Sequence, residues 1–388
     1  MSFSRRSPLS YALGGMIGMA AGMGIGRFIY TPLLPGMMEE LGQTASDAGL
    51  IASANYVGYL VGALAASGGW AQGRERAVML VGVGGTAVLA AMMAMTDSLL
   101  AFMAIRFLAG VASALMMVFL FTIVMHHLMR SGRDDLQPLH FSGVGIGIAL
   151  SSIASAVLVM ANAPWQAGWI WAAVLAAAGF MAVLLLIPDG PAVHADAASE
   201  PPLERNPAFD RLIVSYGLFG FGYVVTATFL VAIVRAGEGG RLFESVVWLA
   251  TGVSIVVSTW LWNAVATRYG PFVAYGAGML IEAFGVVASV TVGGYAGPLI
   301  AAVLLGGTFV GATAVGLQIG RRLSGASPRR GIAILTATFG VGQIVGPLIA
   351  GFLADRTGGY LVPSLAAAGM LLLSTYFVWG ASRRTGLR

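Results

Sequence analysis

Twelve long apolar stretches follow one another along this 388-residue chain. A helix crosses the hydrocarbon core of a bilayer with about 20 apolar residues, and inside the bilayer its backbone polar groups must be satisfied internally. Charged residues make up only 10% of the chain, against about 25% in soluble domains. We therefore predict an all-α polytopic membrane protein with twelve transmembrane helices. They are expected at residues 9–35, 47–68, 77–96, 98–125, 138–160, 165–187, 208–234, 244–266, 271–292, 296–319, 329–354 and 360–381.

The arginines set the expected orientation, because the chain has no lysine. Apart from two arginines inside the apolar stretches, most lie in the terminal segments and in the loops of one side. The loops of the other side hold only Arg235, Arg241 and Arg356. Since cytoplasmic loops carry the excess of basic residues, both termini are expected in the cytoplasm. Residues 2–7 show no signal-peptide cleavage pattern, so the first helix is expected to stay as an anchor. The net charge of +5 follows from these loops and does not indicate nucleic-acid binding.

A polar stretch rich in proline, alanine and acidic residues divides the chain into halves of six helices. We expect the first half at residues 1–187, a flexible cytoplasmic linker at 188–207 and the second half at 208–388. Two glycine patterns recur about 196 residues later and indicate a parallel internal repeat, which is the plan of a rocker-switch transporter. They are Gly24-Ile25-Gly26-Arg27 with Gly220-Phe221-Gly222-Tyr223, and Gly143-Val144-Gly145 with Gly340-Val341-Gly342.

Several motifs resemble the major facilitator superfamily. Thr31-Pro32-Leu33-Leu34-Pro35 is similar to the Thr-Pro-x-x-Pro end of its first helix, and Arg106-Phe107-Leu108-Ala109-Gly110 with Ala114 resembles its Arg-x-x-x-Gly motif in helix four. The stretch Gly346–Gly358 is similar to helix eleven. The stretch Gly24–Gly62 is similar to the bacterial branch labelled YbfB/YjiJ.

The resemblance covers the whole chain and implies a secondary transporter of a bacterial inner membrane, working as a symporter or antiporter by alternating access. It also implies that helices one and four line a central cavity, and that Arg106 takes part in proton coupling. Helix two should pack on eleven, and helix five on eight. One loop departs from the pattern. The usual Gly-x-x-x-Asp-Arg-x-Gly-Arg-Arg between helices two and three is Gly69–Arg76 here and lacks the aspartate, for which Glu75 is a candidate substitute.

Three ionisable residues lie deep in the apolar stretches: Arg27, Arg106 and Glu282. A guanidinium stays charged and costs at least about 2.5–3.5 kcal/mol at bilayer depth. At about 1.5 Å per residue, both arginines lie at similar depth in the first half. Two such groups without a nearby acid predict a receptor for a carboxylate, phosphate or sulfonate. A structural role for Arg27, through hydrogen bonds to carbonyl groups or Asn55, and proton coupling stay open as alternatives.

Other polar residues could complete this pocket. Asn55, Tyr59 and Gly62 form a stripe on one face of helix two, and they could complete the pocket with Tyr30 and, from the second half, Tyr223 and Gln343. Interhelical hydrogen bonding is the alternative for each of them. Glu282 is the only deep carboxylate and is a candidate proton carrier, with a purely structural role as its alternative.

Small residues recur at every fourth position on helices two, five and eleven, which allows close helix packing. Because the resemblance pairs these helices across the halves, we expect them to form smooth seams for a rocking motion, with packing alone as the alternative. The glycines concerned are Gly58, Gly62, Gly143, Gly147, Gly342 and Gly346.

The leading prediction is proton-coupled transport of a small anion, held by Arg27 and Arg106. Proton-driven multidrug efflux is the alternative, although helices one to six hold no deep acid. Cu(I) transport, suggested by Met16, Met19 and Met23, and a non-transporting sensor or assembly factor are weaker alternatives. Without a phosphate-binding loop, a catalytic motif or a cysteine, we expect no enzyme, cofactor or metal site. The expected partners are a small solute, protons and lipid, with the chain as a monomer.

Overall fold

The computed structural model describes residues 7–188, 201–204, 206–237 and 239–385, and within these ranges all regular structure is helical. Twelve of its helices are long and apolar enough to cross a membrane. The prediction of an all-α protein with twelve spans is therefore confirmed. Most of the linker predicted at 188–207 and the polar segment before residue 7 lie outside the described residues.

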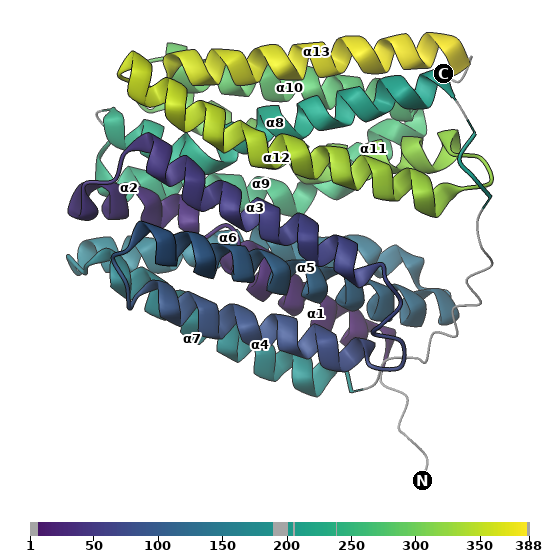
Figure 1. Ribbon diagram of the computed structural model, residues 1–388, viewed down its shortest axis with the longest axis horizontal. Helices are drawn as coiled ribbons and strands as arrows, with labels where there is room; N and C mark the ends of the chain where they lie inside the picture. The colour runs from purple at the N-terminus through teal and green to yellow at the C-terminus, as the bar shows by residue number, and fades with distance from the viewer. Residues whose placement is uncertain (1–6, 189–200, 205, 238, 386–388) are drawn as a thin grey trace.

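The first six spans come from the helices before the linker (Figure 1). These are α1 (Pro8–Met19), the π-helix η1 (Ala20–Ile25), α2 (Tyr30–Leu41), α3 (Ala45–Ala66), α4 (Glu75–Met93), α5 (Leu99–Arg130), η2 (Asp134–Leu136), α6 (Gln137–Met160) and α7 (Trp165–Leu186). The last six spans are α8 (Pro207–Ala236), α9 (Gly240–Tyr269), α10 (Pro271–Thr291), α11 (Ala296–Leu323), α12 (Pro328–Thr357) and α13 (Leu361–Thr385).

Local sequence explains where these helices begin and end. Proline stands in the first turn of α1, α6, α8, α10 and α12, where its missing N–H leaves no hydrogen bond unmade. Thr44 and Asp47 form a reciprocal capping box at the start of α3. Gly42 and Gly358 end α2 and α12 in the left-handed conformation, which glycine adopts without steric cost.

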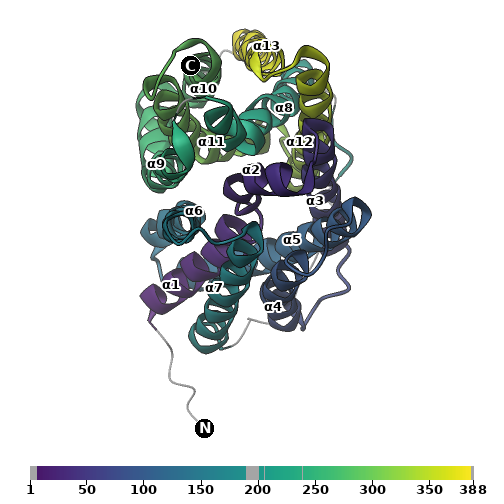
Figure 2. The ribbon, with the colours of Figure 1, turned by 90° about the vertical axis from the view of Figure 1, so that its left-hand side faces the viewer.

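The helices form two groups that pack side by side, as Figure 2 shows along their length. In the first group, α5 packs on α3 and α4, α4 on α7, and α6 on α1. In the second, α8 packs on α12 and α13, and α11 on α9 and α10. Two extensive seams join the groups, α3 on α12 and α6 on α9. These are the pairings of spans two with eleven and five with eight that the resemblance implied.

The first span is broken, although the sequence read as one apolar stretch over 9–35. After α1 the backbone widens into the π-helix η1, with Gly26 N–H bonded to the carbonyl of Ala21 at 2.9 Å, and residues 26–29 form turns before α2 begins. A Cβ atom on Gly24 would lie 2.6 Å from the Cα atom of Gly147 on α6. This close approach needs glycine at that position. Pro32, which has no N–H, adds a second local cause of the break.

The glycines predicted for the seams pack helices within each group, so that part of the prediction is wrong. Gly58 and Gly62 face α5, and a Cβ on Gly62 would lie 2.8 Å from the carbonyl oxygen of Val111. The periodicity identifies a small-residue ridge but not the helix that it faces. Likewise Gly143 and Gly147 face α1 and η1, and Gly342 and Gly346 face α8. The seams instead use Gly49, Gly145, Gly252 and Gly351.

Candidate functional site

Arg106, on α5, fastens the break in the first span. Its Nη1 and Nη2 atoms donate to the carbonyl oxygens of Gly26 and Arg27, each at 2.9 Å. These carbonyls lose their usual helical partners, because Thr31 N–H bonds to Phe28 instead of Arg27. The side chain is 2% exposed. The prediction that Arg106 is free to hold an anion is therefore wrong for two of its nitrogen atoms: it makes the structural bonds that we considered for Arg27.

Two other residues predicted for the pocket belong to the same packing. Asn55 Nδ2 donates to the carbonyl of Arg106 at 2.9 Å, and the Tyr30 hydroxyl donates to the carbonyl of Ala48 at 3.1 Å. Their polar groups thus join α3 to α5 and α2 to α3. For Asn55 and Tyr30, the structure favours interhelical hydrogen bonding over pocket lining.

Arg27 lies in the turns at 26–29, and its guanidinium is enclosed by aromatic rings. Its Cζ atom is 4.3 Å from the ring centre of Tyr59, 4.6 Å from that of Tyr56 and 5.7 Å from that of Phe28. A cation over an aromatic face is stabilised by the ring quadrupole. The side chain is 5% exposed, and its Nε and Nη2 atoms have no hydrogen-bond partner among the described residues. Two charged N–H groups are therefore left without an acceptor in the described part of the chain. The Tyr59 hydroxyl contacts Met117 Sδ at 3.0 Å.

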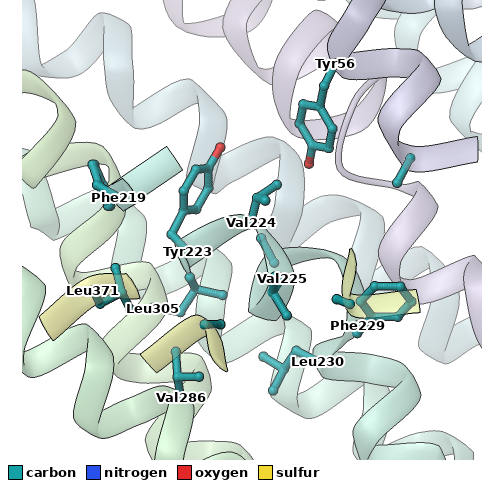
Figure 3. Close-up of a cluster of buried hydrophobic side chains, with 14 of the residues drawn as sticks. Tyr56, Phe219, Tyr223, Val224, Val225, Phe229, Leu230, Val286, Leu305 and Leu371 are labelled. Atoms are coloured by element: carbon teal, nitrogen blue, oxygen red, sulfur yellow. The ribbon is translucent and has the colours of Figure 1, made fainter. Parts of the chain in front are cut away.

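The second group of helices presents neutral and aromatic residues to this region. The ring of Tyr223 lies almost parallel between those of Phe309 and Phe339, at 5.2 Å and 5.4 Å. Gln343 Nε2 donates to the Tyr223 hydroxyl. Phe309 also contacts Phe28 across the interface, with ring centres 5.9 Å apart. Figure 3 shows the hydroxyl groups of Tyr223 and Tyr56 directed toward the region between the two groups.

The structure thus brings Arg27 onto Tyr59 and Gln343 onto Tyr223, on either side of the Phe28–Phe309 contact, and it adds residues that the sequence analysis missed. Tyr56 is three residues before Tyr59 and contacts the same guanidinium, but it was not counted in the stripe of Asn55, Tyr59 and Gly62. Phe28, Phe309 and Phe339 carry no polar group, so they look like ordinary apolar filler. Only their stacking around Tyr223 distinguishes them.

Glu282 lies inside the second group, on α10 between α11 and α13. It is 1% exposed, and its Oε2 atom accepts a hydrogen bond from Thr308 Oγ1 at 3.0 Å. Its Oε1 atom has no partner in the described part of the chain. The Oε1 atom of this buried carboxyl group could therefore take up a proton.

Hydrogen bonds join the two groups from the middle of the helices to the end away from the termini, on the left in Figure 1. Thr31 Oγ1 donates to the carbonyl of Ala227 at 2.7 Å, and Ser53 Oγ to that of Ile344 at 2.8 Å. Nearer that end, the carboxylate of Asp355 on α12 accepts from the backbone N–H of Ala45 and Ser46, at 3.0 Å and 2.9 Å. Asp355 thereby caps the first turn of α3 from the other group, with its charge at the positive end of the helix dipole.

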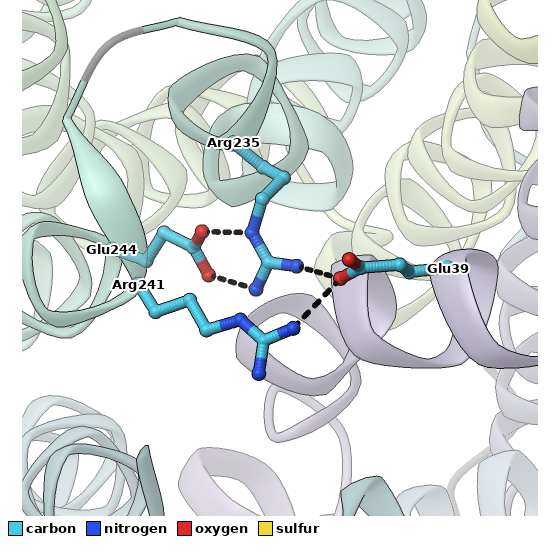
Figure 4. A network of polar contacts seen from close by, with 4 residues as sticks. All are labelled: Glu39, Arg235, Arg241 and Glu244. Carbon is cyan, nitrogen blue, oxygen red and sulfur yellow. Dashed lines mark hydrogen bonds and ion pairs between the residues drawn. The ribbon is translucent and has the colours of Figure 1, made fainter. Parts of the chain in front are cut away.

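An ion network closes the same end (Figure 4). Arg235, at the end of α8, contacts Glu244 with two nitrogen atoms and Glu39 of α2 at 2.7 Å. Arg241 contacts the same Glu39 oxygen at 3.1 Å. Two of the three arginines placed by the sequence in loops on that side thus bind an acid of the opposite group.

Glu75, the candidate substitute in the loop before α4, binds within its own loop. Its Oε1 atom accepts from the N–H of Gly73 at 3.0 Å. The neighbouring Arg76 donates to the carbonyls of Ile187 and Leu184, at 2.7 Å and 3.1 Å. The contacts of both residues thus lie within the first group of helices.

Comparisons with known proteins agree with this architecture. The sequence profile of a family described as "Uncharacterised MFS-type transporter YbfB" matches residues 19–378, where MFS denotes the major facilitator superfamily. A mutant of the nucleoside transporter NupG superimposes with a TM-score of 0.79 at 14% identity, over 96% of this chain and 99% of that one. A bacterial homologue of the human lysosomal transporter Spinster, in an inward-facing and occupied conformation, gives 0.73 at 14% identity, over 97% and 96%. The search of curated proteins found no match.

Proposed function

Because the chain belongs to the family of MFS-type transporters described by YbfB, we propose that it moves a small anionic solute across a bacterial inner membrane by alternating access. Its family and its structural neighbours are transporters rather than enzymes. The observation that carries the anionic part of the proposal is the guanidinium of Arg27, which is buried at the interface of the two groups with Nε and Nη2 unpartnered among the described residues.

The charge of Arg27 favours a carboxylate, sulfonate or phosphate as the bound group. Charge-assisted hydrogen bonds to such anions are roughly twice as strong as neutral ones. An anion would also neutralise a cation that otherwise costs at least about 2.5 kcal/mol in the membrane. The rings of Tyr56 and Tyr59 lie against this guanidinium. We place the Tyr223–Gln343 pair of the second group opposite it, because Phe309, which stacks on Tyr223, contacts Phe28 next to Arg27. A cationic drug would meet an uncompensated like charge, so multidrug efflux is disfavoured.

The contacts between the groups support an inward-facing arrangement. With the termini in the cytoplasm, the Asp355 cap and the Glu39–Arg235–Arg241 network lie on the outer side of the membrane. These contacts would hold that side closed while a solute leaves or enters from the cytoplasm. Opening to the outside would require all of them to separate.

Proton coupling is assigned to Glu282 rather than to Arg106. A carboxyl group can carry a proton, and the free Oε1 atom of Glu282 could accept one. Arg106 keeps its charge and is bonded to Gly26 and Arg27, so its contribution to coupling would be to hold the break at residues 26–29 in position.

Binding and flux measurements on the purified protein test the anion. A thermal-shift screen with carboxylates, sulfonates and phosphates should find a ligand that stabilises the wild type, and its neutral amide analogue should not. Arg27→Ala should weaken binding and uptake into proteoliposomes about 10–100-fold, as expected for a lost charge-assisted hydrogen bond. Arg133→Gln removes an exposed positive charge paired with Asp135 and should leave both unchanged.

Uptake of the same anion that is undiminished in Arg27→Ala would overturn the proposal. In the same assay, Glu282→Gln should remove the dependence of uptake on a proton gradient while binding persists. Unchanged proton dependence in that variant would refute the role of Glu282 and leave the anion site intact.

A further inference from the structure

A separate cavity of about 590 Å³ lies among the ends of α9, α10 and α11, at the same end of the molecule as the termini. None of its lining residues belongs to the aromatic region around Arg27, although α11 contributes residues to both. Its polar lining comes from three consecutive spans: Asn263, Thr267 and Arg268 on α9, and Gln318 and Arg322 on α11, with Gly270 and Pro271 at the start of α10.

The lining carries positive charge without a counter-charge. Arg268 and Arg322 contribute two guanidinium groups, and the nine residues that line the cavity include no acidic side chain. Gln318 and Asn263 add amide groups that can donate hydrogen bonds. The arrangement is typical of a site for a phosphate or another oxyanion, which guanidinium groups bind with geometric specificity.

The start of α10 places the positive end of a helix dipole at the same cavity. Gly270, with φ of 89°, and Pro271 line the cavity, and no side chain caps the helix there. The first-turn N–H groups of a helix lack intrahelical acceptors and carry the positive end of the helix dipole. This helix dipole adds a second source of positive potential to that of the two arginines.

The surface beside the cavity distinguishes a lipid from a soluble anion. Val253, Val257 and Leu261 lie on the face of α9 that ends at Arg268, since their spacings of four, four and seven residues keep one helix face. All three side chains are exposed, at 56%, 60% and 54%. An apolar strip therefore runs along a membrane span directly from the positively charged cavity.

We propose that this cavity binds the phosphate headgroup of an anionic phospholipid of the cytoplasmic leaflet, with its acyl chains along the exposed face of α9. Basic pockets between transmembrane helices on the cytoplasmic side suit such headgroups. The site depends on the membrane orientation but not on the transported solute, so it stands or falls separately from the anion proposal.

Native mass spectrometry of the full-length, delipidated protein tests the site. We use phosphatidylglycerol as the probe, with phosphatidylcholine and glycerol phosphate as comparisons. Wild-type protein should retain phosphatidylglycerol most tightly, and Arg268→Gln with Arg322→Gln should weaken it about thirtyfold. Arg321→Gln is the matched control, because it removes the neighbouring charge on α11 from outside the cavity lining and should bind like the wild type.

Three results would overturn the assignment. Equal weakening by Arg321→Gln would show that only general surface charge matters. Binding of glycerol phosphate as tight as that of phosphatidylglycerol would make the ligand a soluble phosphate. Unchanged lipid retention in the double variant would exclude the cavity. If the double variant does not fold, the single variant Arg322→Gln and the neutral change Gln318→Leu should each weaken phosphatidylglycerol retention, and their failure to do so would refute the site as well.

Discussion

Two arginines buried within the same helix group differ in the hydrogen bonds of their guanidinium groups. Arg106 donates hydrogen bonds from two nitrogen atoms to the carbonyls of Gly26 and Arg27, at the break in the first span. Arg27 stacks on Tyr56 and Tyr59 and leaves Nε and Nη2 without a partner among the described residues. At the residue scale, the first arginine therefore holds the backbone, whereas the second keeps two N–H groups without an acceptor, as the proposed anion site requires.

This difference predicts opposite effects on stability. Arg106→Gln should lower the free energy of unfolding by about 2–4 kcal/mol, because it removes two interhelical hydrogen bonds of about 1–2 kcal/mol each. Arg27→Gln should leave stability unchanged or raise it, because it removes a buried charge that costs at least about 2.5 kcal/mol. Thermal unfolding of the ligand-free protein in detergent measures both. A larger loss for Arg27→Gln than for Arg106→Gln would contradict these roles.

At the scale of single helices, the N-terminus of α3 is stabilised in part by a residue of the second group of helices. Its N-terminus is capped twice. Thr44 and Asp47 cap it from within its own group, and Asp355 caps it from α12. Only the second cap must break when the two groups separate, so it stabilises the present arrangement specifically.

Asp355→Asn should therefore shift the population toward the arrangement that is open on the outer side. A cap and a charge at a helix N-terminus contribute about 0.5–2 kcal/mol, which corresponds to a shift of about 2–30-fold. The measurement is the labelling rate of a single cysteine at the buried seam position Ser53, which bonds to Ile344 across the interface, by an impermeant maleimide added from outside. Asp47→Asn removes the same charge from the same helix end without crossing the interface. Faster labelling in both variants alike would mean that the cap has no specific role in closing the outer side.

Particular residues show what the sequence could and could not provide about these elements. Length and hydropathy located all twelve spans, because a bilayer demands both. The break at residues 26–29 was missed, because η1 and α2 are as apolar as an unbroken helix. Gly58 and Gly62 were assigned to a seam and lie against α5 instead, since periodicity gives a face but not its neighbour. Arg27 stood out through its charge, whereas Phe309 and Phe339 could be recognised only from their three-dimensional stacking.

At the scale of the whole molecule, contacts across the interface support the proposed internal repeat. Thr31 bonds to Ala227 and Glu39 to Arg235, and both pairs are 196 residues apart. This is the offset at which Gly24-Ile25-Gly26-Arg27 matches Gly220-Phe221-Gly222-Tyr223. Equivalent residues of two repeats can touch only near the axis that relates them, so α2 and α8 would lie along that axis. The repeat is not exact, because α8 is continuous where its counterpart is broken.

Motion of one group against the other predicts that a covalent bridge across a seam stops transport. Ser152 Oγ on α6 bonds to the carbonyl of Ser245 on α9 at 2.6 Å. The chain has no cysteine, so Ser152→Cys with Ser245→Cys introduces the only thiols. Once mass spectrometry shows the disulfide, uptake should cease, and reduction should restore it.

The control bridge lies within one group. Ser215 and Ser374 join α8 to α13, with their hydroxyl oxygens 2.9 Å apart. A disulfide between cysteines at these positions should leave uptake intact, because the two helices would move together. Persistent uptake with the Ser152–Ser245 bridge closed would rule out rocking about this seam.

The interrupted first span has a mechanical consequence. Segment α1 packs on α5, α6 and α7 of its own group, whereas α2 makes its most extensive contacts with α8 of the other. The covalent boundary between the moving bodies would then lie partly inside this span, at residues 26–29, and not only at the linker. If the bodies rock, residues 26–29 must act as a hinge, because they connect a helix of one body to a helix of the other. Arg27 lies in this segment, so binding of the solute by Arg27 and bending of the first span would be directly coupled.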